Sequence, residues 1–168
     1  SIAYEPQYFN RAALLLARFV AEETESQNHN STHDSFKELF HLYLSGTHAL
    51  VEVRLTVVQQ LLESEDKRLN ACGLTALAAL LENFHFTSSH DFSFGGGHRD
   101  FGWIPTDAEI SAWFKAVIAF AMTYVNSNSP HSLDIKQLLA QYFRGLWINA
   151  GICTELEKLA KDFAAGNG

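Results

Sequence analysis

Apolar residues recur every three or four positions along most of this chain, a spacing that predicts amphipathic α-helices. Within residues 7–23, for example, one helical face is expected to carry Phe9, Ala12, Ala13, Leu16, Phe19 and Val20. Capping residues, glycines and prolines divide the pattern into seven segments. We expect the first helix over about 7–23, the second from an Asp34 cap to Gly46, and the third over 48–63 after a Thr47 cap. The fourth is expected from a Ser64 cap to about Asn83, and the fifth from a Thr106 cap to a stop at 126–130. The sixth is expected from Ser132 to Gly151, and the seventh over about 152–164.

Two further details predict how these helices are held. Glu109 lies three residues after Thr106, which is the pattern of a capping box. Gly73 and Gly145 lie inside helices, where glycine costs about 1 kcal/mol relative to alanine. We therefore expect each glycine to admit the close approach of a neighbouring helix. Short connections predict antiparallel pairs of the third with the fourth helix and of the fifth with the sixth, while the first and second pair across a longer connector.

Composition limits the classes of protein to which the chain can belong. The 168 residues suit one domain, and an apolar content of 47% is sufficient for a buried core. A formal net charge of -7 repels phosphate backbones, so we expect no nucleic-acid partner. Without a run of about 18 apolar residues or a signal-peptide pattern, we expect no membrane span and a cytoplasmic location. Cys72 and Cys153 are expected to be two buried free thiols.

Residues 84–105 interrupt the helical pattern with aromatic residues, glycines and histidines. Long loops inside compact domains tend to be functional or disordered, and the aromatic content argues against disorder. A short strand or hairpin over 85–94 is an alternative that Gly95 to Gly97 would cut off. We interpret this segment as an ordered loop whose aromatic residues anchor it between helices and whose outer face is open to a partner. The candidate interaction residues are Phe94, His98, Arg99, Asp100, Phe101 and Trp103.

The polar residues of the loop do not match a known catalytic or binding pattern. Gly95 to Gly97, followed by Arg99, lacks the Lys-Ser/Thr pair and the helix N-terminus of a phosphate-binding loop. Several side chains there could bind a metal, but their spacing matches no standard zinc pattern. They are His85, His90, Asp91, His98 and Asp100. Outside the loop, His41 and His48 flank a helix junction, where we expect them to cap carbonyls rather than bind metal.

No pair of carboxylates is expected to meet in a cleft, and no serine lies in a Gly-x-Ser-x-Gly frame. We therefore expect no catalytic residue, no cofactor and no metal. A metal-dependent enzyme that uses the loop histidines remains the alternative at this point.

One stretch of the chain resembles a HEAT-like repeat. It covers residues 53–77, with Arg54 in the first helix, a polar turn at 64–66 and small residues in the second helix. The resemblance implies an array of helix pairs packed side by side.

A wider region, from residue 39 to about 124, is similar to helical regions of large bacterial multidomain NTPases of the STAND type. The similarity depends on Leu42 to Ala49, Gly73 to Leu77, Phe94-Gly95 and Arg99 to Trp103. In such proteins the NTPase module lies elsewhere, and the helical array is a sensor or scaffold. This chain departs from the pattern around Gly96 to His98 and has no Walker motif, so no nucleotide hydrolysis is implied.

From these observations we expect an all-α domain over 1–168, built of antiparallel helical hairpins in a short α-solenoid. We interpret it as a fragment of a longer bacterial protein. We expect a protein–protein interaction, scaffold or sensor module without catalytic activity. Its partner would be another protein or other domains of the parent chain, and its uncapped ends make a homodimer plausible. A HEAT-like nucleic-acid binder is a further alternative and would require a basic concave face.

Overall fold

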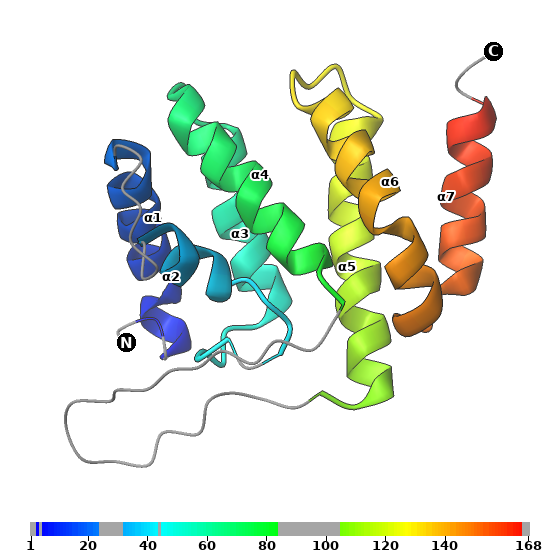
Figure 1. The fold of residues 1–168 in the computed structure, drawn as a ribbon, viewed down its shortest axis with the longest axis horizontal. Coiled ribbons are helices and arrows are strands. Elements are labelled where there is room, and N and C mark those ends of the chain that lie inside the picture. The colour runs from blue at the N-terminus through cyan, green and yellow to red at the C-terminus, as the bar shows by residue number, and fades with distance from the viewer. Residues whose placement is uncertain (1–2, 4, 24–31, 44, 84–104, 166–168) are drawn as a thin grey trace.

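The structure is a computed structural model that describes residues 3, 5–23, 32–43, 45–83 and 105–165. Within these ranges the chain is all-helical (Figure 1). The helices are α1 (Pro6–Glu22), α2 (Thr32–Glu38), α3 (Val51–Leu62), α4 (Lys67–Leu81), α5 (Asp107–Val125), α6 (Ser132–Asn149) and α7 (Cys153–Ala165). The expectation of an all-α fold is confirmed for the part of the chain that the structure describes.

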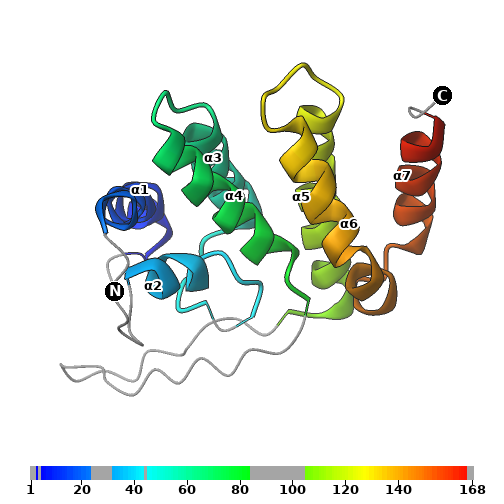
Figure 2. The same cartoon turned by 45° about the horizontal axis from the view of Figure 1, so that its top comes forward.

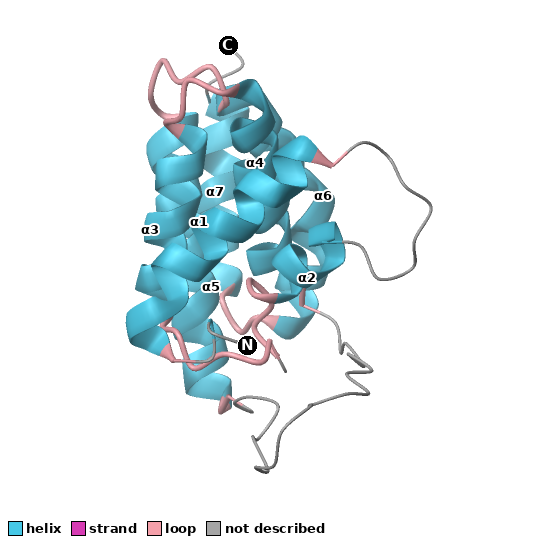
Figure 3. Ribbon diagram, turned by 90° about the vertical axis from the view of Figure 1, so that its left-hand side faces the viewer, coloured by secondary structure: helices cyan, strands magenta, loops and turns pink. Residues whose placement is uncertain are grey.

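The helices form two layers that run the length of the molecule. In one layer α3 packs between α1 and α5, and in the other α4 packs between α2 and α6 (Figure 3). Between the layers, α1 contacts α2, α3 contacts α4, and α5 contacts α6. The row begins with α1 and ends with α7, which lies against α6 (Figure 2). One face of α1 therefore lies at an end of the row.

The boundaries of four helices agree with expectation to within a residue or two. α1 begins with Pro6 in its first turn, and α5 begins with the predicted capping box, in which Thr106 Oγ1 accepts from the Glu109 N–H and the Glu109 carboxylate accepts from the Thr106 N–H. α6 and α7 are separated by Gly151, whose φ of +64° ends α6 in the left-handed conformation that glycine adopts without strain.

The predicted extension of the second helix to Gly46 is wrong. α2 ends at Glu38, and the chain then tightens into turns in which the N–H groups of Leu39 and Phe40 reach back three residues. After these turns, Arg54 Nη1 donates to the carbonyl oxygens of Leu39 at 2.7 Å and His41 at 2.8 Å. These charge-assisted hydrogen bonds stabilise the non-helical course of the chain.

The expected caps of α2, α3 and α4 also differ from the structure. Asp34 lies in the first turn of α2, which begins at Thr32. Thr47 accepts from the N–H of Ala49 in a local turn, so α3 starts later, at Val51, after an N-cap without a side-chain hydrogen bond. α4 is capped by Asp66, whose carboxylate accepts from the Arg68 N–H at 2.9 Å. The sequence alone does not separate neighbouring polar residues that can each cap a helix.

Of the described helices, α5 has the length and apolar composition that a membrane span requires. Its buried residues contribute to the protein core instead. They are Trp113, Phe114, Val117, Ile118, Ala121 and Val125. In this structure the helix packs against α3, α4 and α6.

Candidate interaction surface

The six residues predicted to form the interaction loop all lie outside the described residues. These are Phe94, His98, Arg99, Asp100, Phe101 and Trp103. The prediction of an ordered interaction loop over 84–105 therefore stays a prediction. The strongest candidate surface in the described part of the chain lies elsewhere, on α1.

α1 carries two apolar faces. One is buried in the core through Phe9, Ala13 and Ala17. The other is open to solvent, with Leu15 at 53% and Phe19 at 58% exposure. A single exposed apolar side chain is ordinary for a protein surface, but a row of them along one helix is a candidate contact surface.

The open face of α1 has the spacing of a helix-packing seam. Tyr8, Ala12, Leu15 and Phe19 follow one another at intervals of four, three and four residues. This is the alternation of a heptad repeat, in which two apolar positions in every seven face a partner helix. Tyr8 is 50% exposed, and Ala12 between it and Leu15 is half-buried. We call these four residues the α1 seam.

Two positive charges flank the α1 seam on one side. Arg11 and Arg18 are both exposed, and each precedes a seam residue by one position. In a heptad these are the flanking positions whose charges select the partner. The flank is basic although the whole chain carries a net charge of -7.

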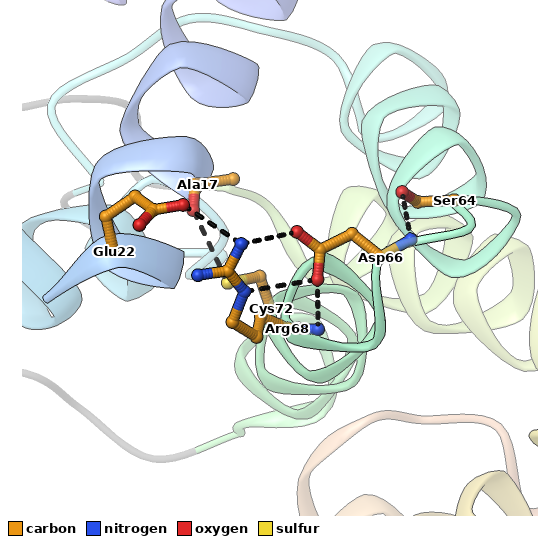
Figure 4. A network of polar contacts seen from close by, with 6 residues as sticks. All are labelled: Ala17, Glu22, Ser64, Asp66, Arg68 and Cys72. Carbon is orange, nitrogen blue, oxygen red and sulfur yellow. Dashed lines mark hydrogen bonds and ion pairs between the residues drawn. The ribbon is translucent and has the colours of Figure 1, made fainter. Parts of the chain in front are cut away.

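A polar bridge holds the C-terminal end of α1 against the start of α4 (Figure 4). Arg68 Nη2 lies 3.0 Å from a carboxylate oxygen of Glu22 and 3.0 Å from one of Asp66. The Cys72 thiol donates to the carbonyl oxygen of Ala17 at 3.7 Å. The exposed ion pairs stabilise little individually, but together with the buried contacts they fix the orientation of α1.

A second polar cluster lies between α2 and the C-terminal end of α4. The Glu82 carboxylate lies 2.7 Å from Lys37 Nζ and 2.9 Å from His41 Nε2. Burial raises the pKa of Glu82, but the hydrogen bonds from His41 and Lys37 outweigh burial and hold that pKa below its ordinary value. The His41 ring therefore pairs with a carboxylate through Nε2, which is a structural role.

Tyr142 of α6 lies within the electrostatic range of this cluster. Burial and the Glu82 charge raise the pKa of its phenol, and Lys37 lowers it. The cluster thus contains a histidine, a carboxylate, an ammonium and a phenol, the types of side chain that carry out acid–base chemistry. The Lys37 ammonium neutralises the Glu82 carboxylate, and the cluster links α2 to the end of α4.

Neither metal-binding nor disulfide chemistry is supported in the described ranges. No group of three or more His, Cys, Asp or Glu side chains converges among the residues that the structure describes. Cys72 is buried, as expected, whereas Cys153 is exposed at the first position of α7, so the expectation of two buried thiols is wrong for Cys153. The histidines of the loop alternative lie outside the described residues.

Comparison of the chain with protein-family models, curated proteins and solved structures finds no match. The functional interpretation therefore depends on the geometry of the chain itself. Sequence reasoning missed the α1 seam because the core face and the seam together were taken as one apolar face. The sequence did contain the signal. The apolar positions of α1 cover a wider part of its circumference than a helix needs when it packs on one side.

Proposed function

We propose that this domain is a non-catalytic interaction and scaffold module of the HEAT-like helical-repeat type, and that its α1 seam binds an amphipathic helix of a protein partner or of another domain of the parent chain. The observation that carries the proposal is the exposed heptad spacing of Tyr8, Leu15 and Phe19 on the helix at the end of the row. Terminal helices of stacked arrays leave an apolar face that requires covering. The two-layer arrangement of successive helix pairs supports an array of this type.

The basic flank specifies the chemistry of the partner. A helix with acidic residues beside its apolar seam would face Arg11 and Arg18 with opposite charge. An antiparallel second copy of α1 would instead bring Arg11 near Arg18 of the other copy. We therefore favour an acidic amphipathic helix over self-pairing.

Two designed helical peptides test this proposal. Both carry leucines at the heptad seam positions over about three heptads, and they differ only in having Glu or Lys at the flanking positions. We expect the Glu-flanked peptide to bind about tenfold more tightly in fluorescence anisotropy, with a preference that weakens as salt is added. The double variant Arg11→Glu/Arg18→Glu should reverse the preference, because it reverses the charge of the flank.

Leu15→Glu is expected to abolish binding of both peptides, whereas Leu133→Glu, which changes another exposed leucine, should leave binding intact. Equal binding to Leu15→Glu and the unsubstituted chain would contradict the proposal. Size-exclusion chromatography with light scattering decides on the alternative occupant. A dimer that Leu15→Glu dissociates would make a second copy, rather than an acidic helix, the partner of this face.

A further inference from the structure

The proposed interaction surface on α1 has two unlike sides. Arg11 and Arg18 line one side, and both are exposed. Phe9 and Leu16 line the other side, since each follows a residue of the α1 seam by one position. Phe9 is buried, and Leu16 is half-buried and packed against the core. A helix that lies along the seam therefore meets positive charge on one side and hydrocarbon on the other.

These two sides correspond to the flanking positions of a heptad, which are named e and g. Counting Ala12 as position a and Leu15 as position d places the two arginines at g, and it places Phe9 and Leu16 at e. In an antiparallel pair of helices the g positions of both helices meet, and so do the e positions. In a parallel pair g meets e. The flank on which a partner carries its acidic residues therefore depends on the direction in which it lies along α1.

Negative charge is concentrated at the C-terminal end of α1. Glu22 lies in the last turn, which contains no basic residue, and Glu23 is the C-cap. The backbone dipole of a helix adds a partial negative charge at the same end. Arg68 of α4 lies 3.0 Å from Glu22, but both side chains are exposed to solvent, and Glu23 adds a second carboxylate. This end of α1 therefore attracts the N-terminal end of a partner helix, which carries a partial positive charge.

The N-terminal end of α1 is less negative. Its N-cap is Glu5, whose side chain makes no capping hydrogen bond, and the first turn of α1 contains no acidic residue. The partial positive charge of the helix dipole opposes the charge of Glu5 at this end, whereas at the other end the dipole and the carboxylates have the same sign. The difference between the two ends favours a partner whose own dipole is opposed to that of α1.

We propose that the helix that binds the α1 seam lies antiparallel to α1, with acidic residues at its g positions and apolar residues at its e positions. This inference rests on the function proposed above, to which it adds the direction of the partner and the side that carries its charge. The acidic residues then pair with Arg11 and Arg18. The apolar residues cover Phe9 and Leu16, where a carboxylate would lose water without gaining a partner. Such a helix is apolar at three positions in every seven.

Disulfide cross-linking in a glutathione redox buffer determines the direction of the partner. Glu5→Cys places a thiol three positions before Tyr8, in a Cys153→Ser background that removes the exposed native thiol. The probes are two versions of the peptide with Glu at both flanks, one with a cysteine at its N-terminus and one with a cysteine at its C-terminus. We expect the C-terminal cysteine to give a yield about threefold higher or more. Gln60→Cys, an exposed position of α3 outside the seam, is the control and should cross-link to neither peptide above background.

Two further peptides of identical composition test which side of the partner carries the charge. Both have leucine at a and d, but one has Glu at g and Ala at e, whereas the other has Ala at g and Glu at e. We expect the first to bind about threefold more tightly in fluorescence anisotropy, because only the first faces the arginines while it lies antiparallel to α1. In Arg11→Gln/Arg18→Gln the two peptides should bind equally. In Lys158→Gln/Lys161→Gln, which removes two exposed charges of α7, the difference should persist.

Equal affinities of these two peptides for the unsubstituted chain, or tighter binding of the peptide with Glu at e, would overturn the inference. Equal cross-linking yields, or a higher yield from the N-terminal cysteine, would overturn it as well. If none of the peptides binds, the proposed function fails. If they bind without a preference for direction or side, the proposed function stands and only the orientation of the partner is refuted.

Discussion

Arg54 holds the connector between α2 and α3 through hydrogen bonds to its backbone. Its guanidinium fixes three backbone carbonyls of the connector between α2 and α3, and it lies against the aromatic rings of Trp113 and Phe9. Burial lowers the pKa of Arg54 to about 9, so the side chain remains protonated at neutral pH. The positive charge is balanced by carbonyl dipoles, which bind a guanidinium without neutralising it.

Replacing Arg54 should therefore lower the free energy of unfolding, even when the new residue is apolar and of similar length. Arg54→Met removes the donors but leaves the carbonyls of Leu39, His41 and Ala49 buried, and each unsatisfied group costs about 1–3 kcal/mol. We expect a loss of about 3 kcal/mol or more in the free energy of unfolding, measured by urea denaturation. Arg144→Met, at an exposed position, should change it by less than about 0.5 kcal/mol. A loss below about 1 kcal/mol for Arg54→Met would show that water replaces the guanidinium.

Glu82 predicts an acid-sensitive contribution to stability. Its pKa in the folded protein lies below the ordinary value of 4.5, because hydrogen bonds from His41 and Lys37 outweigh the effect of burial. The stabilisation is therefore present above that value and is lost as the pH falls through the folded pKa. Between about pH 6 and pH 3, we expect the unfolding free energy of Glu82→Gln to depend less on pH than that of the unsubstituted chain. The exposed Glu157→Gln is the matched control, and equal slopes for both variants would disprove the role of Glu82.

At the scale of elements, the two helical glycines set how closely helices approach. A Cβ at Gly73 would meet the side chain of Leu62 at 3.0 Å, and one at Gly145 would meet Asn83 Nδ2 at 2.5 Å. The expectation that a helix approaches closely is confirmed at Gly73, where Leu62 belongs to α3, whereas the close neighbour of Gly145 is Asn83, which follows the end of α4. The Asn83 contact is the more restrictive, since Asn83 is buried and accepts from Asn149 at 3.2 Å.

Gly145→Ala is therefore expected to destabilise the protein, although alanine favours helix by about 1 kcal/mol over glycine. The new methyl group forces Asn83 from its place between α4 and α6, which costs about 1–3 kcal/mol for overpacking. Thermal or urea unfolding measures the net loss. In the Asn83→Ala background the clash is absent. Adding Gly145→Ala to Asn83→Ala should therefore leave the free energy of unfolding unchanged or increase it. Additive losses would mean that Asn83 does not limit the approach.

The elements themselves follow from local sequence signals, whereas their junctions do not. The capping box of α5 and the glycine after α6 depend on residues within one turn, and both were predictable. The turn after α2 is held by Arg54, fifteen positions after Leu39, and no local pattern contains that bond. The same limit applies to the pairing of His41 with Glu82. The α1 seam was visible in the spacing, but its exposure depends on which helices lie beside α1.

The whole molecule has an uneven distribution of packing along its row of helices. α3 and α4 each contact helices of both layers, while α7 makes its substantial contacts with α6. The Lys115–Glu155 ion pair also links α7 to α5 at 2.7 Å, but both side chains are exposed and stabilise little. Local unfolding is governed by such differences in buried contact.

Hydrogen exchange should therefore reveal a gradient of protection from the middle of the row to its end. We expect the amides of α3 and α4 to exchange only through global unfolding, and those of α7 to exchange faster through local opening. Leu156→Ala truncates a fully buried side chain of α7 and should accelerate exchange in α7 while leaving α3 and α4 nearly unchanged. Leu61→Ala, a matched truncation of a buried side chain in α3, should accelerate exchange everywhere. If Leu156→Ala instead accelerated α3 and α4 as much as α7, the domain would unfold as one cooperative unit, and nearest-neighbour packing would not govern its stability.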